Sequence, residues 1–304
     1  MRTRPEIREL GLNAGKKARL QRILYQFGLR NGTALFLPYD QGLEHGPRDF
    51  FANPEAGDPA YIAKLAVAGG FNGIAIQVGL AEKFYWDYAG EVPLILKLNG
   101  KTDIPSADRA LSPLHASVAD AVRLGADAVG YTLYVGTPAA EADFAQYRQV
   151  RDEARRLGMP LIVWAYPRGA AIEAKGGKDS FYAVDYAART ASELGADMVK
   201  VNFPHPEKRT AVPSAYDADF SAGQAIDAVV RSANRTLLLV SGGERAGDEA
   251  MLEKARLSME AGATGLIFGR NVWQREHRES LAFVARLQEI LAKYGDVPAR
   301  LVTS

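Results

Sequence analysis

The sequence predicts an α/β protein, a closed (β/α)8 or TIM barrel formed as one domain over residues 1–304. Between residues 33 and 273, short apolar runs alternate with amphipathic stretches, which is typical of strand–helix units around a parallel sheet. Eight such runs follow one another, and no linker or low-complexity segment interrupts them. Eight units in a chain of 304 residues favour a closed barrel over an open doubly wound sheet.

The predicted strands follow in order along the chain. They are Ala34–Asp40, Gly73–Gly79, Pro93–Asn99, Ala128–Val135, Leu161–Pro167, Met198–Phe203, Thr236–Ser241 and Thr264–Gly269. Similar glycine-containing sequences precede four of the strands, at Ala68–Gly70, Leu124–Asp127, Leu194–Asp197 and Ala261–Thr264. Glycine there suits the left-handed residue that ends a helix before the chain turns into the next strand.

The N-terminal segment, residues 1–30, precedes the first predicted strand. Its stretch Lys16–Phe27 is expected to be helical. We expect this extra helical segment to cover the bottom of the barrel or to pack on a neighbouring molecule.

Composition argues against several classes of function. Lys and Arg number 37 against 36 Asp and Glu, without the basic stripe that nucleic-acid binding needs. No run approaches the roughly 18 apolar residues of a membrane helix, and Met1–Pro5 leads into charged residues rather than an apolar signal core. We therefore expect a cytoplasmic protein with neither a nucleic-acid nor a membrane partner.

Metal and cofactor chemistry is also disfavoured by the residues present. The chain has no cysteine, and its four histidines, His45, His115, His205 and His277, stand far apart without His-Glu-x-x-His spacing. The glycine-containing turn Asp40–Pro47 is not the Gly-x-Gly-x-x-Gly of dinucleotide sites. We expect no metal site and no cofactor.

Lys200 is a cation within an otherwise apolar predicted strand. A buried ammonium is costly, so this lysine either reaches solvent, pairs with a carboxylate, or lowers its pKa and becomes a nucleophile able to form a Schiff base. In the fifth run, Leu161, Val163 and Ala165 share one face, whereas Trp164, Tyr166 and Arg168 share the other and project toward the lumen and its mouth.

The same alternation collects polar groups at the C-terminal ends of other strands, where barrel enzymes place their catalytic residues. It predicts that Asp40, Lys97, Asn99, Lys101 and Asn202 point inward. Core packing of the aromatic side chains and a turn or N-cap role for Asp40 are the alternatives. If Lys97 and Lys101 lie close, their charge would help keep Lys200 unprotonated.

The turns after the last two predicted strands suit an anion. Ser241, Gly242 and Gly243 end the seventh unit's strand, and Gly269 and Arg270 follow in the eighth, where barrels commonly hold phosphate. Arg270 could bind phosphate oxygens bidentately. A phosphate site beside an inward lysine, a phenol and a carboxylate suggests cleavage next to a phosphorylated ketone, with an iminium as electron sink.

Five segments carry a resemblance to a known family. They are Pro38–Pro47, Lys97–Thr102, Trp164–Gly169, Val199–Asn202 and Ser241–Gly243. Together they resemble the archaeal-type (DhnA-like) class I fructose-1,6-bisphosphate aldolases, a Schiff-base family built on the (β/α)8 barrel. The same scaffold is also similar to Schiff-base transferases making aminodideoxyheptulosonate precursors and to a thiolase acting on phosphorylated signalling molecules.

The resemblance implies a role for each matching position. Lys200 would form the Schiff base, Tyr166 would be the main proton donor and acceptor, and Asp40 would orient or deprotonate the substrate hydroxyl. Trp164 would shape the pocket. The remaining roles are in phosphate binding: Ser241, Gly242, Gly243, Gly269 and Arg270 for the phosphate of the dihydroxyacetone half, His45 and Arg168 for the distal phosphate. The family resemblance also implies a homo-oligomer, often a decamer.

The leading hypothesis is a metal-independent lyase of glycolysis or gluconeogenesis that reversibly cleaves fructose 1,6-bisphosphate to dihydroxyacetone phosphate and glyceraldehyde 3-phosphate. A transferase or thiolase using the same lysine is the alternative. A phosphosugar-binding protein without chemistry is a third reading, but binding alone would not need a lysine, a phenol and a carboxylate together.

Overall fold

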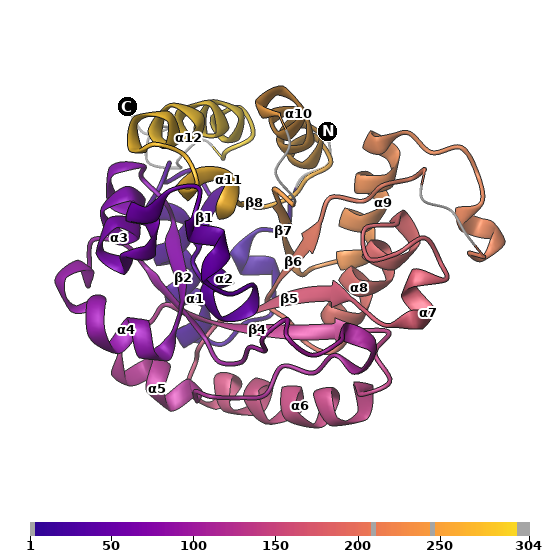
Figure 1. Ribbon diagram of the computed structural model, residues 1–304, viewed down its shortest axis with the longest axis horizontal. Helices are drawn as coiled ribbons and strands as arrows, with labels where there is room; N and C mark the ends of the chain where they lie inside the picture. The colour runs from indigo at the N-terminus through magenta and orange to yellow at the C-terminus, as the bar shows by residue number, and fades with distance from the viewer. Residues whose placement is uncertain (1–3, 208–210, 244–246, 297–304) are drawn as a thin grey trace.

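The computed structural model describes residues 4–207, 211–243 and 247–296, and within these residues eight parallel strands close into a barrel (Figure 1). The strands are β1 (Ala34–Pro38), β2 (Gly73–Gln77), β3 (Leu94–Lys97), β4 (Ala128–Val135), β5 (Leu161–Pro167), β6 (Met198–Asn202), β7 (Leu237–Ser241) and β8 (Gly265–Ile267). Each strand pairs with the next in the chain, and β8 pairs with β1. The predicted (β/α)8 fold is confirmed.

Helices surround the barrel and also lie at its two ends (Figure 1). They are α1 (Ala14–Tyr25), α2 (Gln41–Glu44), α3 (Pro59–Ala68), α4 (Val78–Phe84), α5 (Val118–Arg123), α6 (Ala140–Arg156), α7 (Ala170–Glu173), α8 (Phe181–Glu193), α9 (Ala222–Ala233), α10 (Asp248–Glu260), α11 (Arg270–Trp273) and α12 (His277–Ala292). Short 3-10 turns occupy Ile7–Glu9, Pro47–Phe50, Pro54–Gly57, Trp86–Tyr88, Ala107–Arg109 and Ser214–Tyr216. The glycines expected to end helices, Gly70, Gly125, Gly195 and Gly262, have φ angles of 59°, 69°, 94° and 96°.

Two apolar cores result from strand alternation. Phe36, Ile95, Ile162 and Trp164 belong to the core inside the barrel. Residues of the opposite face, including Leu161, Val163 and Ala165 of β5, pack in the larger core between strands and helices. The predicted two-faced fifth strand is therefore confirmed, and a side chain's position in its strand decides which core it enters.

Helix α1 covers the bottom of the barrel, where the strands begin. Asn13 caps the helix by accepting a hydrogen bond from the Lys16 amide. Leu20, Ile23 and Leu24 are buried in the core inside the barrel. The expected N-terminal helix is thus present, two residues earlier at each end than the predicted stretch, and it covers the barrel bottom. Residues 1–3 of this segment lie outside the described residues.

Strand pairing ends earlier at the mouth than the apolar runs predict. The run Ala34–Asp40 is paired only to Pro38, and Asp40 precedes the first residue of α2. Likewise, β3 ends at Lys97, two residues before the predicted end. The residues beyond the paired strands form the wall of the mouth. No helix in the described part of the chain is long and apolar enough to cross a membrane.

Candidate active site

The mouth of the barrel contains a cavity of about 480 Å³. It is lined by Pro38, Asp40, Gln41, Glu44, His45, Arg48, Trp164, Tyr166, Arg168, Lys178, Asp179, Lys200, Asn202, Ser241, Gly242, Gly243, Ile267, Gly269, Arg270 and Asn271. Of the thirteen predicted site residues, eleven line this cavity, and Lys97 and Lys101 do not.

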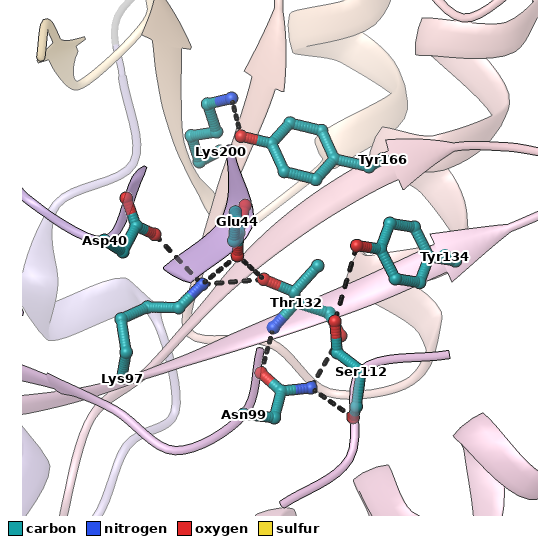
Figure 2. A network of polar contacts seen from close by, with 9 residues as sticks. All are labelled: Asp40, Glu44, Lys97, Asn99, Ser112, Thr132, Tyr134, Tyr166 and Lys200. Carbon is teal, nitrogen blue, oxygen red and sulfur yellow. Dashed lines mark hydrogen bonds and ion pairs between the residues drawn. The ribbon is translucent and has the colours of Figure 1, made fainter. Parts of the chain in front are cut away.

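Lys200 projects from β6 into the cavity with only 4% of its surface exposed. Its amine donates a hydrogen bond to the Tyr166 hydroxyl oxygen at 2.7 Å (Figure 2). A second bond, of 3.1 Å, goes to Asn202 Oδ1. Burial lowers the pKa of Lys200 to about 7, because desolvation disfavours the ammonium more than the nearby carboxylates of Asp40 and Glu44 favour it. A large fraction of neutral amine is therefore available near neutral pH.

Tyr166 lies one strand away, on β5. Burial raises the pKa of its hydroxyl well above the usual value of 10.0, and the charges of Glu44 and Asp40 raise it further. The Arg168 guanidinium lies 5.1 Å from the centre of the Tyr166 ring and lowers the pKa, although less strongly. The phenol therefore keeps its proton over the physiological range, which suits a group that donates a proton during a reaction.

Lys97 lies behind the cavity wall and is completely buried. Its ammonium donates to Thr132 Oγ1 at 2.6 Å and lies 3.2 Å from Asp40 Oδ2 and 3.7 Å from Glu44 Oε1 (Figure 2). It also lies 4.3 Å from the centre of the Trp164 ring. Gly130 of β4 makes room for this packing, because a Cβ there would lie 2.8 Å from both Lys97 and Trp164.

These contacts correct the expected roles of Lys97 and Lys101. Burial is the main cause of the lowered pKa of Lys200, and the cation that lowers it further is Arg168. Lys97 is instead paired with the carboxyl groups of Asp40 and Glu44. The Lys101 ammonium bonds the Thr102 carbonyl oxygen near the surface. Lys101 points away because the chain has left β3 four residues earlier, at Lys97, so strand alternation no longer fixes its direction.

The opposite side of the cavity is formed by the ends of β7 and β8. Ser241 donates a 2.8 Å hydrogen bond to Asn202 Oδ1, the oxygen that also accepts from Lys200. Arg270, at the start of α11, lies 3.7 Å from the Asp49 carboxylate. His45 Nδ1 lies 2.8 Å from the same Asp49 oxygen. The structure thus brings His45 and Arg270 together around one carboxylate.

Sequence reasoning missed several residues of the cavity. Glu44, Arg48, Lys178 and Asp179 line it without having been predicted to belong to the site, and Asn202 was placed inward without a role. Asp179 Oδ1 accepts a 2.6 Å bond from Asn202 Nδ2, which fixes the amide beside Lys200. Glu44 stands one helical turn after Asp40, and that spacing was a usable signal once Asp40 was placed. The other missed residues lie in loops that strand alternation does not govern.

A lysine of lowered pKa beside a protonated phenol, at the mouth of a (β/α)8 barrel, is the arrangement of a Schiff-base enzyme. Residues 34–275 match the model of the DeoC/LacD family of aldolases. The chain belongs to this family and, within it, to the archaeal-type class I fructose-bisphosphate aldolases. Within the described residues, no group of three or more His, Asp or Glu side chains is placed to hold a metal ion.

Individual relatives cover almost the whole chain. The class 1 fructose-bisphosphate aldolase of Thermoproteus tenax is 40% identical over 267 residues, which are 88% of this chain and 91% of that protein. That of Halobacterium salinarum is 36% identical over 272 residues, or 90% and 95%. A solved archaeal fructose-1,6-bisphosphate aldolase, whose catalytic lysine is covalently bound to the carbinolamine intermediate of its substrate, is 38% identical with a TM-score of 0.77, over 91% of this chain and 100% of that one.

Proposed function

We propose that this protein is a class I aldolase that reversibly cleaves fructose 1,6-bisphosphate to dihydroxyacetone phosphate and glyceraldehyde 3-phosphate. The observation that carries the proposal is the buried Lys200 amine, 2.7 Å from the Tyr166 hydroxyl in a polar cavity. The relatives named as fructose-bisphosphate aldolases support the choice of substrate.

The chemistry begins with the neutral amine of Lys200, which attacks the C2 carbonyl of the open-chain sugar. Tyr166 donates a proton to the carbonyl oxygen, and loss of water from the carbinolamine gives an iminium. Asp40 then takes the proton of the C4 hydroxyl as the C3–C4 bond breaks, and the electron pair of that bond enters the iminium to form an enamine. Glyceraldehyde 3-phosphate leaves, C3 of the enamine is protonated, and water releases dihydroxyacetone phosphate from Lys200.

We assign the two phosphates to two sets of cavity residues. Ser241, Gly242, Gly243, Gly269 and Arg270 would hold the phosphate of the dihydroxyacetone half. His45 and Arg168 would reach the distal phosphate, and Trp164 would shape the pocket. Arg48 and Lys178 also line the cavity, and Arg48 is paired with Asp103. We further propose a homo-oligomer, as the family resemblance implies, and a cytoplasmic location, as the sequence composition suggests.

Covalent trapping tests the proposal. Borohydride added with dihydroxyacetone phosphate should reduce the iminium, inactivate the enzyme, and add the mass of the reduced triose phosphate to the peptide that contains Lys200. Lys200→Met is the control that should remain unlabelled. Labelling of Lys97 or Lys101 instead would reject the assignment.

Turnover measured in the same preparation separates the alternatives. Fructose 1,6-bisphosphate should be cleaved, and prolonged incubation with EDTA should leave the rate unchanged, since an iminium rather than a metal ion stabilises the carbanion. An adduct on Lys200 without cleavage of the bisphosphate would favour a Schiff-base transferase. The absence of both would favour a phosphosugar-binding protein.

A further inference from the structure

Two carboxyl groups share one ammonium at the base of the cavity (Figure 2). Lys97 is completely buried, and the Asp40 and Glu44 side chains are 4% and 13% exposed. The Lys97 nitrogen is closer to Asp40, at 3.2 Å, than to Glu44, at 3.7 Å. Thr132 Oγ1 accepts from Lys97 and donates to Glu44 Oε1 over 3.5 Å, so the hydroxyl connects the ammonium to the more distant carboxyl group.

The charges of this group do not balance if both carboxyl groups are ionised. One ammonium offsets one carboxylate, and an uncompensated buried carboxylate costs several kcal/mol. A proton on one of the two removes this cost, and two carboxyl groups in different surroundings commonly divide their protons in this way. The distances favour ionised Asp40 and protonated Glu44.

The surroundings of Glu44 support this choice. Burial raises its pKa most, and the charge of Asp40 raises it further, whereas Lys97, His45 and Lys200 lower it. Two other titratable groups that face it, Tyr134 on β4 and Tyr166 on β5, both have pKa values raised mainly by burial. Both phenols are therefore neutral near neutral pH and add no charge beside Glu44.

We propose that Glu44 is a protonated positioning residue: it shares Lys97 with Asp40 and leaves Asp40 as the ionised partner that accepts the substrate hydroxyl proton. This role rests on the proposed aldol cleavage. The proton from the sugar hydroxyl moves to Asp40 as the C3–C4 bond breaks and returns to the aldehyde oxygen in the reverse reaction. Glu44 keeps its own proton throughout.

Protonated Glu44 also preserves the nucleophile. An ionised Glu44 raises the pKa of Lys200, as Asp40 does. A negative charge on Glu44, in addition to that of Asp40, would therefore increase the fraction of Lys200 in the ammonium form and slow its attack on the carbonyl. One carboxylate supplies the base, and the proton on the other limits the charge near the amine.

Neutral isosteres at the two positions test the proposal. Glu44→Gln resembles a protonated carboxyl group and should retain at least about a tenth of the wild-type kcat for fructose 1,6-bisphosphate, whereas Asp40→Asn removes the base and should lose roughly 100-fold or more. Glu44→Ala deletes the hydrogen-bonding group and should lose at least about tenfold. Equal large losses in Glu44→Gln and Asp40→Asn would overturn the proposal, and so would a Glu44→Ala variant with wild-type kcat.

Infrared difference spectroscopy provides a measurement that does not depend on turnover. The wild-type protein without substrate, at neutral pH, should show the C=O band of a protonated carboxyl group that is absent from Glu44→Gln. A missing band in a folded wild-type protein would reject the protonated state. If the wild type neither cleaves the bisphosphate nor forms an adduct, the proposed function fails while this band still decides the state of Glu44.

The pH profile gives a third readout, which a merely structural role would not change. Above the pKa of Glu44, the second carboxylate forms and the wild-type kcat should fall. Glu44→Gln has no proton to lose there, so its profile should stay level to higher pH. Coincident alkaline limbs in the two proteins would overturn the proposal.

Discussion

Lys16 of α1 and Lys200 of β6 are both buried, the first at the bottom of the barrel and the second at its mouth, yet their surroundings differ in one respect. At the bottom of the barrel, the Lys16 ammonium lies 2.6 Å from Asp197 Oδ2, just before β6 begins. At the mouth, the Lys200 amine faces a phenol and a carboxamide, and no carboxylate of the described residues is recorded within 4.0 Å of it. The side chains are 6% and 4% exposed, so burial alone does not distinguish them.

The comparison shows that the partner decides what a buried lysine can do. A carboxylate in contact stabilises the ammonium, and the pair then fixes structure, here the position of α1 under the barrel. Neutral acceptors do not offset the loss of hydration, and the pKa of Lys200 falls to about 7 as a result of burial. The first lysine links α1 to the residue before β6, and the second is available for chemistry.

We expect the largest effect from removing the hydroxyl of Tyr166, the neutral partner of Lys200 at the mouth. Tyr166→Phe removes one oxygen and keeps the ring, so we expect kcat to fall roughly 10²- to 10⁴-fold with little change in ground-state binding. Steady-state kinetics with fructose 1,6-bisphosphate measures both. An unchanged kcat would mean that another group moves the proton, and Asp40 would be the first candidate.

A change in the ion pair of Lys16 and Asp197 at the barrel bottom should alter the stability of the protein instead of its activity. Lys16→Met leaves the Asp197 carboxylate buried without its cation, and we expect the free energy of unfolding to fall by about 3–5 kcal/mol. Denaturant unfolding measures the loss, and the double variant Lys16→Met/Asp197→Asn should recover part of it. A single variant as stable as the wild type would show that this pair does not hold α1 in place.

Arg168, which directly follows the strand that carries Tyr166, tests substrate binding separately from proton transfer. Arg168→Ala removes a charge assigned to the distal phosphate, and a charge-assisted hydrogen bond is worth about 1.5–3 kcal/mol, which corresponds to roughly 10- to 150-fold in KM. Fructose 1-phosphate, which lacks the distal phosphate, should show a much smaller rise. Equal losses with both substrates would place Arg168 in a structural role or at the other phosphate.

The smallest effect is the pH dependence of imine formation. Because the pKa of Lys200 is lowered to about 7, the neutral amine predominates above this pH and declines below it. The rate of borohydride-trapped adduct formation should therefore fall about tenfold per pH unit below 7 and stop rising above it. A rate that keeps rising toward pH 10 would show that Lys200 has the pKa of an ordinary lysine.

Much of the site could be predicted because strand alternation is a local property. Each inward residue of a barrel strand is fixed by counting from its neighbours, and so Trp164, Tyr166 and Lys200 were placed together from two short runs. The same counting failed for Lys101, which lies beyond the last paired residue of β3. Counting also could not show that Lys97 pairs with carboxyl groups instead of repelling Lys200.

The sequence by itself determined the number of strand–helix units, the closed barrel and the inward face of each strand, because all three depend on the order and spacing of residues along the chain. Only the tertiary structure decided which carboxyl group contacts which lysine. Asp197 contacts Lys16, and both Asp40 and Glu44 contact Lys97. Lys16 and Asp197 are 181 positions apart in the chain, and Lys97 lies 57 positions after Asp40 and 53 after Glu44. Charge interactions act through space over a few ångströms, and barrel closure alone brings such distant residues that close.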